Sequence, residues 1–296
     1  MVKTRFHTMN SPRVHFIPYH GHPLILQAQI VDIITLRRPM LTVNDIAVVI
    51  PALNEELRIR GVVDDALRYC PTVIVVDDGS TDATLERIAG LNVTVVRHPE
   101  RMGKGASLRD GFAKALELGK QGVVTMDGDG QHAGHDIPRL LAAANQYPNH
   151  IVIGARLKKR ALQPKYRTMA NHFGDWGIAW GTGYQIADTQ SGQRFYPANV
   201  MALQDVPAEG FVFEAEILIS AAQHLGTRVV SVPIESRYSS QESEEEFRAS
   251  HFRPLHDLFG ITSHVVRRVL SSRSMVDTYR EIRRHPPVIF DPPAND

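Results

Sequence analysis

The sequence of 296 residues predicts an α/β protein whose mostly parallel sheet is flanked by helices. Strand-like and helix-like segments alternate four times from residue 46 onward. The strand segments are continuous runs of Val and Ile, which is typical of strands that helices cover on both faces. Polar motifs follow three of these strands directly. Because ligands of such sheets bind at the carboxyl ends of the strands, we expect a binding site there.

The individual elements follow from the spacing of apolar residues. The expected strands are residues 46–51, 73–76, 93–96, 123–126, 151–154 and 229–234. Apolar residues three or four apart predict helices that end near 69 and at 88, and others that cover 106–118, 137–147, 168–180 and 211–225. Residues 188–194 read as a polar turn. The aromatic residues Phe173, Trp176 and Trp180 are expected in the core.

The regular pattern is confined to the middle of the chain, which suggests four parts. Residues 1–43 lack a sustained period and predict a partly irregular N-terminal arm. Residues 44–240 form the main domain. Residues 241–275 combine an acidic loop with an amphipathic helix, which either lies on a membrane surface or packs against the main domain. Residues 276–296 carry Arg and Pro with little apolar content and predict a tail.

Composition narrows the class of protein. Apolar residues make up 43% and charged residues 22% of the chain, as in ordinary globular proteins. A formal net charge of +1 gives no overall attraction to nucleic acid, so no such partner is expected. The lone cysteine, Cys70, allows no internal disulfide and is expected in the core. No run has the length of a membrane span. We therefore expect a cytoplasmic protein, or one peripheral to the inner face of a membrane.

Two carboxylates follow the fourth strand, in the stretch Asp127-Gly128-Asp129. Carboxylates at this spacing suit a hard divalent cation such as Mg²⁺ or Mn²⁺, and glycine lets a large ligand approach the backbone. A solvated Asp-Gly turn is the alternative for this motif taken alone. The cation would hold a pyrophosphate, which accumulates charge when it leaves a nucleotide-linked sugar.

Other motifs suit the remainder of such a donor. Asp77 and Asp78 follow the second strand and are suited to accept hydrogen bonds from a base or a ribose. Lys104 and Arg156 are candidates for phosphate contacts. The spacing around Gly103-Lys104-Gly105 is not that of a P-loop. The loop after the first strand also lacks the glycine pattern of dinucleotide-binding dehydrogenases.

The order of these motifs resembles the family 2 inverting glycosyltransferases. The matching stretches are 49–56 (VIPALNEE), 76–80 (VDDGS), 103–105 (GKG) and 127–132 (DGDGQH). They look most similar to the branch of dolichol-phosphate mannose synthases and polyprenyl-phosphate glycosyltransferases, over residues 46–240. The resemblance implies a single A-type glycosyltransferase domain that binds a UDP- or GDP-sugar.

The resemblance also implies roles for single residues. It places Pro51, Asn54, Glu55 and Asp78 in the nucleotide pocket, and makes Asp127 and Asp129 metal ligands with Gln131 as a third. Asp188 falls where the family has an acidic group near the acceptor and is the first candidate for a general base, followed by Glu214. Arg194 and Arg237 fall where the acceptor or the donor phosphate is bound. A loop cap and an exposed helix residue are the alternative readings of Asp188 and Glu214.

The chain departs from that branch in one loop. Arg237 is followed by several glutamates where relatives carry a lysine for phosphate. The acceptor is therefore left open between a lipid-linked phosphate and a hydroxyl. Two alternative functions are a sugar-phosphate nucleotidyltransferase and a non-catalytic protein that binds a nucleotide sugar. The sugar, the base and the oligomeric state do not follow from the sequence.

Overall fold

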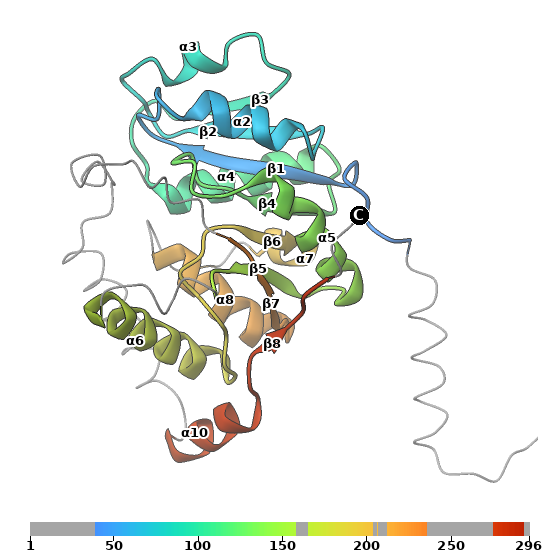
Figure 1. The fold of residues 1–296 in the computed structure, drawn as a ribbon, viewed down its shortest axis with the longest axis vertical. Helices are drawn as coiled ribbons and strands as arrows, with labels where there is room; N and C mark the ends of the chain where they lie inside the picture. The colour runs from blue at the N-terminus through green and yellow to red at the C-terminus, as the bar shows by residue number, and fades with distance from the viewer. Residues whose placement is uncertain (1–38, 158–164, 204–205, 207–211, 236–274, 293–296) are drawn as a thin grey trace, which may run out of the picture. The chain divides into compact units, whose positions relative to one another are not determined.

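An eight-stranded sheet in the order β3-β2-β1-β4-β6-β5-β7-β8 forms the centre of the fold (Figure 1). The structure is a computed structural model that describes residues 39–157, 165–203, 206, 212–235 and 275–292. The strands are β1 (Ile46–Ala52), β2 (Val73–Asp77), β3 (Thr94–Arg97), β4 (Gly122–Thr125), β5 (Ile151–Ala155), β6 (Arg194–Pro197), β7 (Val229–Pro233) and β8 (Val288–Ile289). Strand β6 is antiparallel to both of its neighbours, and the other pairings are parallel. The predicted mostly parallel sheet is confirmed.

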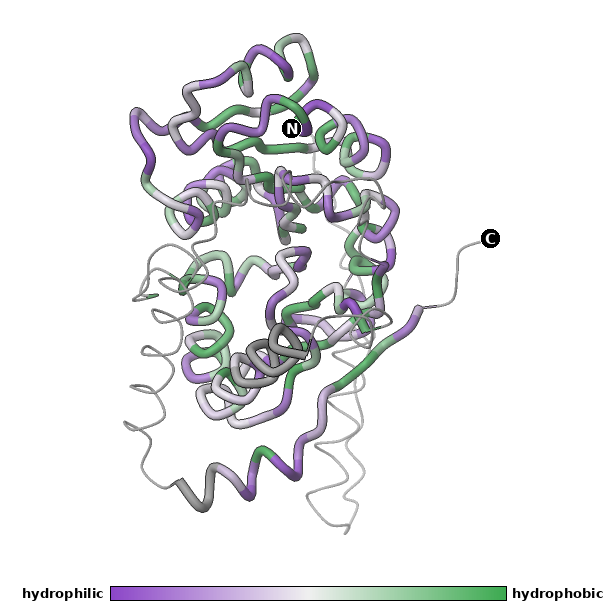
Figure 2. The backbone as a smooth tube through the Cα atoms, turned by 60° about the vertical axis from the view of Figure 1, so that its left-hand side comes forward, coloured by the Kyte–Doolittle hydropathy of each residue, from purple (hydrophilic) through white to green (hydrophobic). Residues whose placement is uncertain are grey.

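Helices cover both faces of this sheet. They are α2 (Ile59–Leu67), α3 (Thr84–Ile88), α4 (Lys104–Glu117), α5 (Ile137–Gln146), α6 (Lys165–Thr182), α7 (Ala198–Met201), α8 (Val212–Leu225) and α10 (Met275–Arg284), with a 3₁₀ turn at Gly134–Asp136. One core lies between the sheet and helices α4, α6, α7 and α8, and the other between the sheet and α2 and α5. The strands from β2 to β7 in the sheet order contribute to both cores, so their apolar runs are continuous, as Figure 2 shows along the central strands, whereas the edge strands β3 and β8 are largely exposed.

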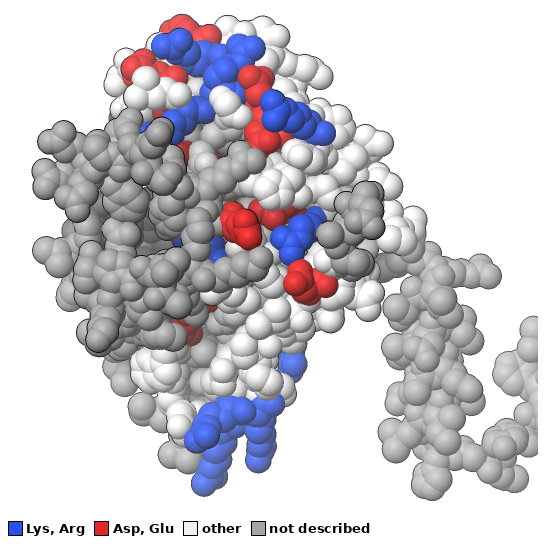
Figure 3. Space-filling view, viewed as in Figure 1, with Lys and Arg blue, Asp and Glu red and all other residues white. Residues whose placement is uncertain are grey.

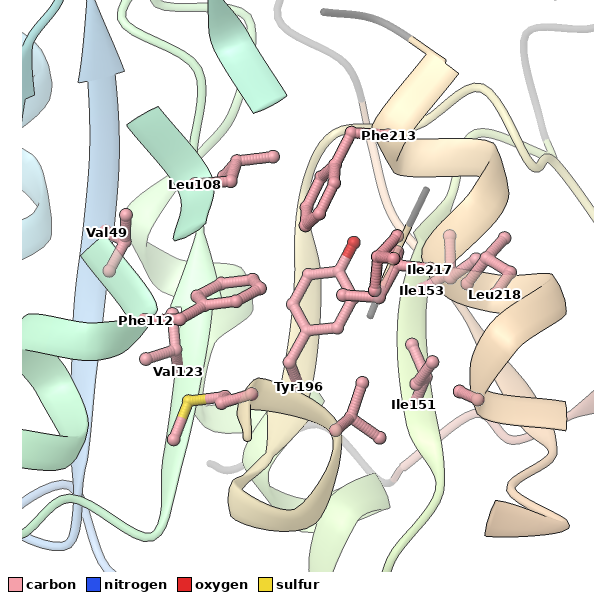
Figure 4. Packing of buried hydrophobic residues seen from close by; sticks show 14 of the residues in the cluster. Val49, Leu108, Phe112, Val123, Ile151, Ile153, Tyr196, Phe213, Ile217 and Leu218 are labelled. Carbon is pink, nitrogen blue, oxygen red and sulfur yellow. The ribbon is translucent and has the colours of Figure 1, made fainter. Parts of the chain in front are cut away.

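Aromatic rings from three elements meet in the first of these cores. The ring of Phe112 on α4 lies 5.0 Å from that of Tyr196 on β6 and 6.5 Å from that of Phe213 on α8 (Figure 4). All three side chains are buried. Helix α4 is thereby fixed against α8, which brings their first residues to the same edge of the sheet.

The strand register brings the polar motifs together. Ala52 at the end of β1 pairs with Asp77 at the end of β2, and Val49 pairs with Thr125 at the end of β4. The loops after these three neighbouring strands therefore leave the sheet at the same edge. This is the convergence that the sequence predicts.

The C-terminal part of the chain differs from the sequence prediction. Residues 276–296 were expected to be a tail, but the described part holds α10 and β8, and β8 pairs with β7. Ile282 supplies the apolar anchor, since it is 7% exposed against Ala179 and Trp180. Residues 1–38, the predicted acidic loop and the predicted amphipathic helix at 252–270 lie outside the described residues.

Two further core predictions can be checked. Cys70 is 1% exposed, as expected. Of the two tryptophans of α6, Trp180 is buried, but Trp176 is 46% exposed, so its assignment to the core is wrong. Helical spacing identifies an apolar stripe but does not reveal whether another element covers each of its members.

Candidate functional site

The Asp127-Gly128-Asp129 turn begins two residues after β4 ends, at the edge where β1, β2 and β4 meet. The backbone N–H of Asp127 donates to Nδ1 of His132 at 3.0 Å, and Oδ1 of Asp129 accepts the N–H of Gln131, also at 3.0 Å. A Cβ added to Gly128 would stand 3.3 Å from both the carbonyl oxygen of Pro51 and Cγ of Glu55. The turn therefore packs closely on the loop after β1.

A single lysine joins two carboxylates at this turn. The ammonium of Lys104, the first residue of α4, lies 2.7 Å from Oδ1 of Asp127 and 2.9 Å from Oε2 of Glu214 on α8. Burial alone would lower the pKa of Lys104, but these two carboxylates raise it above its ordinary value. Burial likewise works against the charged form of Asp127, yet the Lys104 ammonium outweighs it and, together with His132, lowers this pKa to about 2. Both partners are charged at neutral pH.

Two neighbouring carboxylates, Asp129 in the same turn and Glu55 in the loop after β1, have raised pKa values instead. The pKa of Asp129 is raised by burial and by the negative charge of Asp127. Burial, then Asp129 and Asp127, raise the pKa of Glu55 to about 7, although Arg58 works in the other direction. Negative charge is therefore concentrated here beyond what Lys104 neutralises. An added cation would relieve this repulsion.

Loops after β1 and β2 form the neighbouring wall of the site. Asn54 is exposed with a φ of +55°; its N–H donates to Oγ of Ser80 at 2.9 Å, and its Oδ1 accepts the N–H of Thr81 at the same distance. The N–H of Glu55 donates to Oγ1 of Thr84 at 2.8 Å. The structure thus brings the predicted nucleotide residues Pro51, Asn54 and Glu55 to the Asp127 turn.

Asp77 at the end of β2 and Asp78 directly after it are less accessible than their assignment to a nucleotide pocket requires. Asp77 is fully buried, and its Oδ1 accepts the N–H of Ser80 at 3.2 Å. Asp78 is 4% exposed; its carboxylate accepts the N–H groups of Met102, at 2.7 Å, and Gly103, at 2.9 Å. These contacts hold the loop that precedes Lys104. In this structure, therefore, both aspartates shape the wall from within.

His98 completes this internal network, and the sequence reasoning missed it. Its Nδ1 lies 2.8 Å from Oδ1 of Asp78, and its Nε2 lies 2.9 Å from Oδ2 of Asp110 on α4. The ring is 4% exposed. The signal available in the sequence was a polar residue directly after β3, five residues before the Gly103-Lys104-Gly105 motif.

Asp188 lies on the other side of the site in a close pair with Arg156. Its Oδ2 accepts from the backbone N and from Nε of Arg156, both at 2.8 Å, and its Oδ1 accepts from the guanidinium at 2.9 Å. Asp188 is 2% exposed, with a φ of +54°. Both carboxylate oxygens are engaged, which is a poor arrangement for accepting a proton from an acceptor. The role of general base, for Asp188 or Glu214, stays a prediction.

Gly192, four residues further on, touches the Asp127 carboxylate. A Cβ at Gly192 would stand 2.5 Å from Oδ2 of Asp127. The carbonyl of Gly192 accepts the hydroxyl of Thr125 at 2.7 Å, which ties the 188–193 turn to the end of β4. Sequence reasoning assigned no role to this glycine, because the close approach depends on the pairing of β6 with β4.

Arg194 differs from its predicted role in an acceptor or phosphate site. It is 2% exposed, and its guanidinium donates to the carbonyls of Ser191, Thr189 and Glu214, each at 2.7 Å, and to the hydroxyl of Tyr196 at 3.2 Å. These contacts fasten the 188–193 turn to the start of α8. Arg194 is thus a structural anchor here. Arg237 lies outside the described residues.

A comparison with known proteins gives the family of the chain. Residues 47–207, more than half of the chain, match the family model described as "Glycosyl transferase family 2". The match includes all three loops that meet at the Asp127 turn. The chain belongs to this family. It is a glycosyltransferase, and the predicted resemblance is confirmed.

Curated relatives of this glycosyltransferase act on lipid-linked acceptors, according to their names. The UDP-N-acetylglucosamine–dolichyl-phosphate N-acetylglucosaminyltransferase of Methanococcus voltae is 29% identical over 218 residues, which cover 66% of this chain and 86% of that protein. The polyprenol monophosphomannose synthase of Mycolicibacterium smegmatis is 30% identical over 201 residues, which cover 63% and 75%. The predicted branch of the family is therefore confirmed.

A solved structure shares the fold of this glycosyltransferase. Glucosyl-3-phosphoglycerate synthase from Mycobacterium tuberculosis, crystallised with Mn²⁺, UDP and glucosyl-3-phosphoglycerate, superposes with a TM-score of 0.54 at 23% identity, covering 79% of this chain and 85% of that one. At this identity the likeness shows the fold alone. The predicted A-type domain is confirmed.

Two absences concern the part of the chain that the structure describes. In the described ranges, no group of three or more His, Cys, Asp and Glu side chains is arranged to hold a metal ion. Asp127 and Asp129 are thus two carboxylates of one turn, with Gln131 beside them. Over the same ranges, no helix combines the length and apolarity that crossing a bilayer requires.

Proposed function

We propose that this glycosyltransferase transfers a sugar, with inversion and with a divalent cation, from a UDP- or GDP-sugar to a polyprenyl-phosphate acceptor at a membrane surface. The observation that carries the proposal is the charged cluster of Asp127, Asp129, Lys104 and Glu214 at the carboxyl ends of β1, β2 and β4. Ligands of α/β sheets bind at this kind of edge. The names of the curated relatives support the lipid phosphate acceptor.

The residues fit a bound Mg²⁺ or Mn²⁺. Mg²⁺ is commonly held by one or two carboxylates together with substrate phosphates and water, so a cage of three protein ligands is not required. Asp127 and Asp129 would hold the ion, with Gln131 beside them. Burial and the negative charge of neighbouring carboxylates raise the pKa of Asp129 and of Glu55. A bound cation would offset this negative charge. Once bound, the ion would neutralise the charge of the pyrophosphate leaving group.

The protein's own residues would position the reactants. In the reaction, an acceptor oxygen forms a bond to the anomeric carbon while the bond from that carbon to the diphosphate breaks, and the nucleoside diphosphate leaves with both electrons. The loops at Asn54 and Ser80 would hold the nucleotide. Lys104, held by Asp127 and Glu214, would stand beside the departing diphosphate.

Both candidate bases are held in ion pairs, which favours an acceptor that is already an anion. Asp188 pairs with Arg156, and Glu214 pairs with Lys104. A hydroxyl acceptor needs a group that removes its proton, whereas a phosphate is already deprotonated and needs only correct placement. We therefore propose that Asp188 and Glu214 position Arg156 and Lys104 for phosphate groups, and that proton removal by either is needed only for a hydroxyl acceptor.

A transfer assay with the full chain tests the proposal. UDP-glucose, UDP-N-acetylglucosamine and GDP-mannose would each be offered with Mn²⁺ or Mg²⁺ and a short-chain polyprenyl phosphate. We expect one donor to yield a sugar–phosphate–lipid of inverted anomeric configuration. Asp129→Asn should lower the rate about a hundredfold or more. The control, Asp64→Asn, changes an exposed aspartate paired with Arg60 and should leave the rate unchanged. Absence of transfer from every donor, transfer with retention, or full activity in Asp129→Asn would overturn the proposal.

A further inference from the structure

An aromatic cluster joins α6 to α10 at the surface. The rings of Trp176 and Trp180 are 5.6 Å apart, and the ring of Tyr279 on α10 stacks on Trp180 at 6.4 Å and an interplanar angle of 28°. Trp180 is buried, but Trp176 is 46% and Tyr279 48% exposed. Two large aromatic side chains, each in ring contact with Trp180, are thus exposed to solvent. Packing in the core does not account for them.

Exposed arginines lie on the same helix as Tyr279. Arg280, Arg283 and Arg284 are all exposed on α10, and the guanidinium of Arg283 lies 5.8 Å from the centre of the Tyr279 ring. Within residues 279–284 these three positive charges accompany one acid, Glu281, which lies 3.7 Å from the guanidinium of Arg284. Figure 3 shows basic side chains gathered at the end of the molecule where Figure 1 places α10. The whole chain is nearly neutral, so this positive surface is local.

We infer that Trp176, Tyr279 and the arginines of α10, which we call the α6–α10 surface, form a docking site for an anionic lipid bilayer. Trp and Tyr favour the interface between lipid and water because their rings are apolar with a polar atom at one end. Arginines beside them are attracted to anionic headgroups, each contributing separately. An interfacial helix combines these same two features. Charge complementarity thus argues for a bilayer of anionic lipid as the occupant.

The position of the α6–α10 surface relative to the site strengthens this assignment. Asp175, which precedes Trp176, accepts the backbone N–H of Thr189 at 2.9 Å and its hydroxyl at 2.6 Å. Thr189 follows Asp188, and the same turn reaches Asp127 through Gly192. Docking would therefore place a lipid surface next to the turn beside the candidate site. That this brings a lipid-linked acceptor to the site rests on the proposed function. The docking of the α6–α10 surface on a bilayer does not.

Tryptophan emission offers a direct test, because Trp176 and Trp180 are the two tryptophans of the chain. The full-length protein would be titrated with vesicles of phosphatidylglycerol and phosphatidylcholine, and with phosphatidylcholine alone, without donor or acceptor. We expect a blue shift and quenching by brominated lipid with the anionic vesicles, both weakening as salt is raised. Binding without any change in emission would overturn the inference, since another surface would then be responsible. Failure to bind anionic vesicles would overturn it too.

Charge-reversal variants identify the surface. Arg280→Glu with Arg283→Glu should lower partitioning to anionic vesicles about tenfold or more. The matched control, Arg68→Glu with Arg87→Glu, makes the same change in net charge on two exposed residues, one directly after α2 and one in α3, beside the opposite edge of the sheet. Its partitioning should stay within about twofold of the wild type. Equal losses in the two pairs would contradict docking by α10. Tyr279→Ser, which removes an exposed ring, should weaken binding without a change in charge.

Two other occupants would give different results. A blue shift that grows with protein concentration in the absence of vesicles would mean that a second copy of the chain covers the surface. The same shift with a soluble polyanion, without vesicle binding, would mean a polyanion site. Either result overturns the bilayer. Transfer to a water-soluble prenyl phosphate should be unchanged in Arg280→Glu with Arg283→Glu, so loss of docking and loss of catalysis are measured separately.

Discussion

The ammonium of Lys104 stands 2.7 Å from the carboxylate of Asp127, although the two residues belong to different strand–helix units. Lys104 begins α4, where the helix dipole disfavours a positive charge. Asp127 and Glu214 offset this cost, because each carboxylate lies within 3 Å of the ammonium. Lys104 therefore holds together three segments that meet only in the folded chain, its own, that of Asp127 and that of Glu214. Its charge also neutralises part of the acidic site.

Removing the Lys104 charge should destabilise the protein. In Lys104→Met two partly buried carboxylates lose their counterion, so the free energy of unfolding should fall by about 3 kcal/mol at neutral pH. Urea unfolding in metal-free buffer measures this. Lys114→Met on the same helix breaks an exposed pair with Glu117 and should cost about 0.5 kcal/mol or less. Equal losses in the two variants would show that Lys104 is not engaged in this way.

Filling the space at Gly192 should disturb Asp127. The Cβ of Gly192→Ala would stand 2.5 Å from Oδ2 of Asp127, so the carboxylate has to move away from Lys104. Transfer activity should fall about tenfold or more, by analogy with the displacement of groups that support a metal ligand. Gly61→Ala places its Cβ in open space on α2 and should be neutral or slightly stabilising. Wild-type activity of Gly192→Ala would contradict the proposed importance of Asp127.

Glu55 should make stability depend on pH. Its pKa is raised from 4.5 to about 7, so the native state favours the protonated carboxyl. This contribution is fully present below pH 4.5 and is lost as the pH rises through about 7. Relative to Glu55→Gln, the wild-type protein should therefore lose about 2–3 kcal/mol of unfolding free energy between pH 4.5 and pH 8 in metal-free buffer.

The check is a series of unfolding curves over that pH range. Glu117→Gln changes an exposed glutamate, and its difference from the wild type should stay flat. A flat difference for Glu55→Gln as well would mean that burial and the neighbouring carboxylates do not raise the pKa of Glu55.

Asp188→Asn separates positioning from proton transfer. Asn tolerates the φ of +54°, so the backbone is retained while the charge that holds Arg156 is lost. If Asp188 positions Arg156, kcat/KM for a phosphate acceptor should fall about tenfold to a hundredfold, mainly through KM, with an unchanged pH profile. A collapse of kcat together with loss of the basic limb of the profile would instead identify Asp188 as the general base.

Local sequence patterns determined much of this protein. Continuous apolar runs identified β1, β2, β4, β5 and β7, because strands covered on both faces leave no polar face. The motifs after these strands then indicated one shared edge, since parallel strands present their carboxyl ends together. The order of the motifs was specific enough to identify the family.

Only the tertiary structure decided which side chains meet. Strand β6 is short and polar at its start, and its antiparallel place between β4 and β5 is what brings Gly192 to Asp127 and buries Arg194. Asp78 turns inward to His98 and the N–H of Gly103, although the sequence shows it as a polar loop residue. Periodicity reports which face of an element is buried, but it carries no information about the partner. The pairing of Lys104 with Asp127 and Glu214, and the exposure of Trp176 beside α10, therefore follow from packing alone.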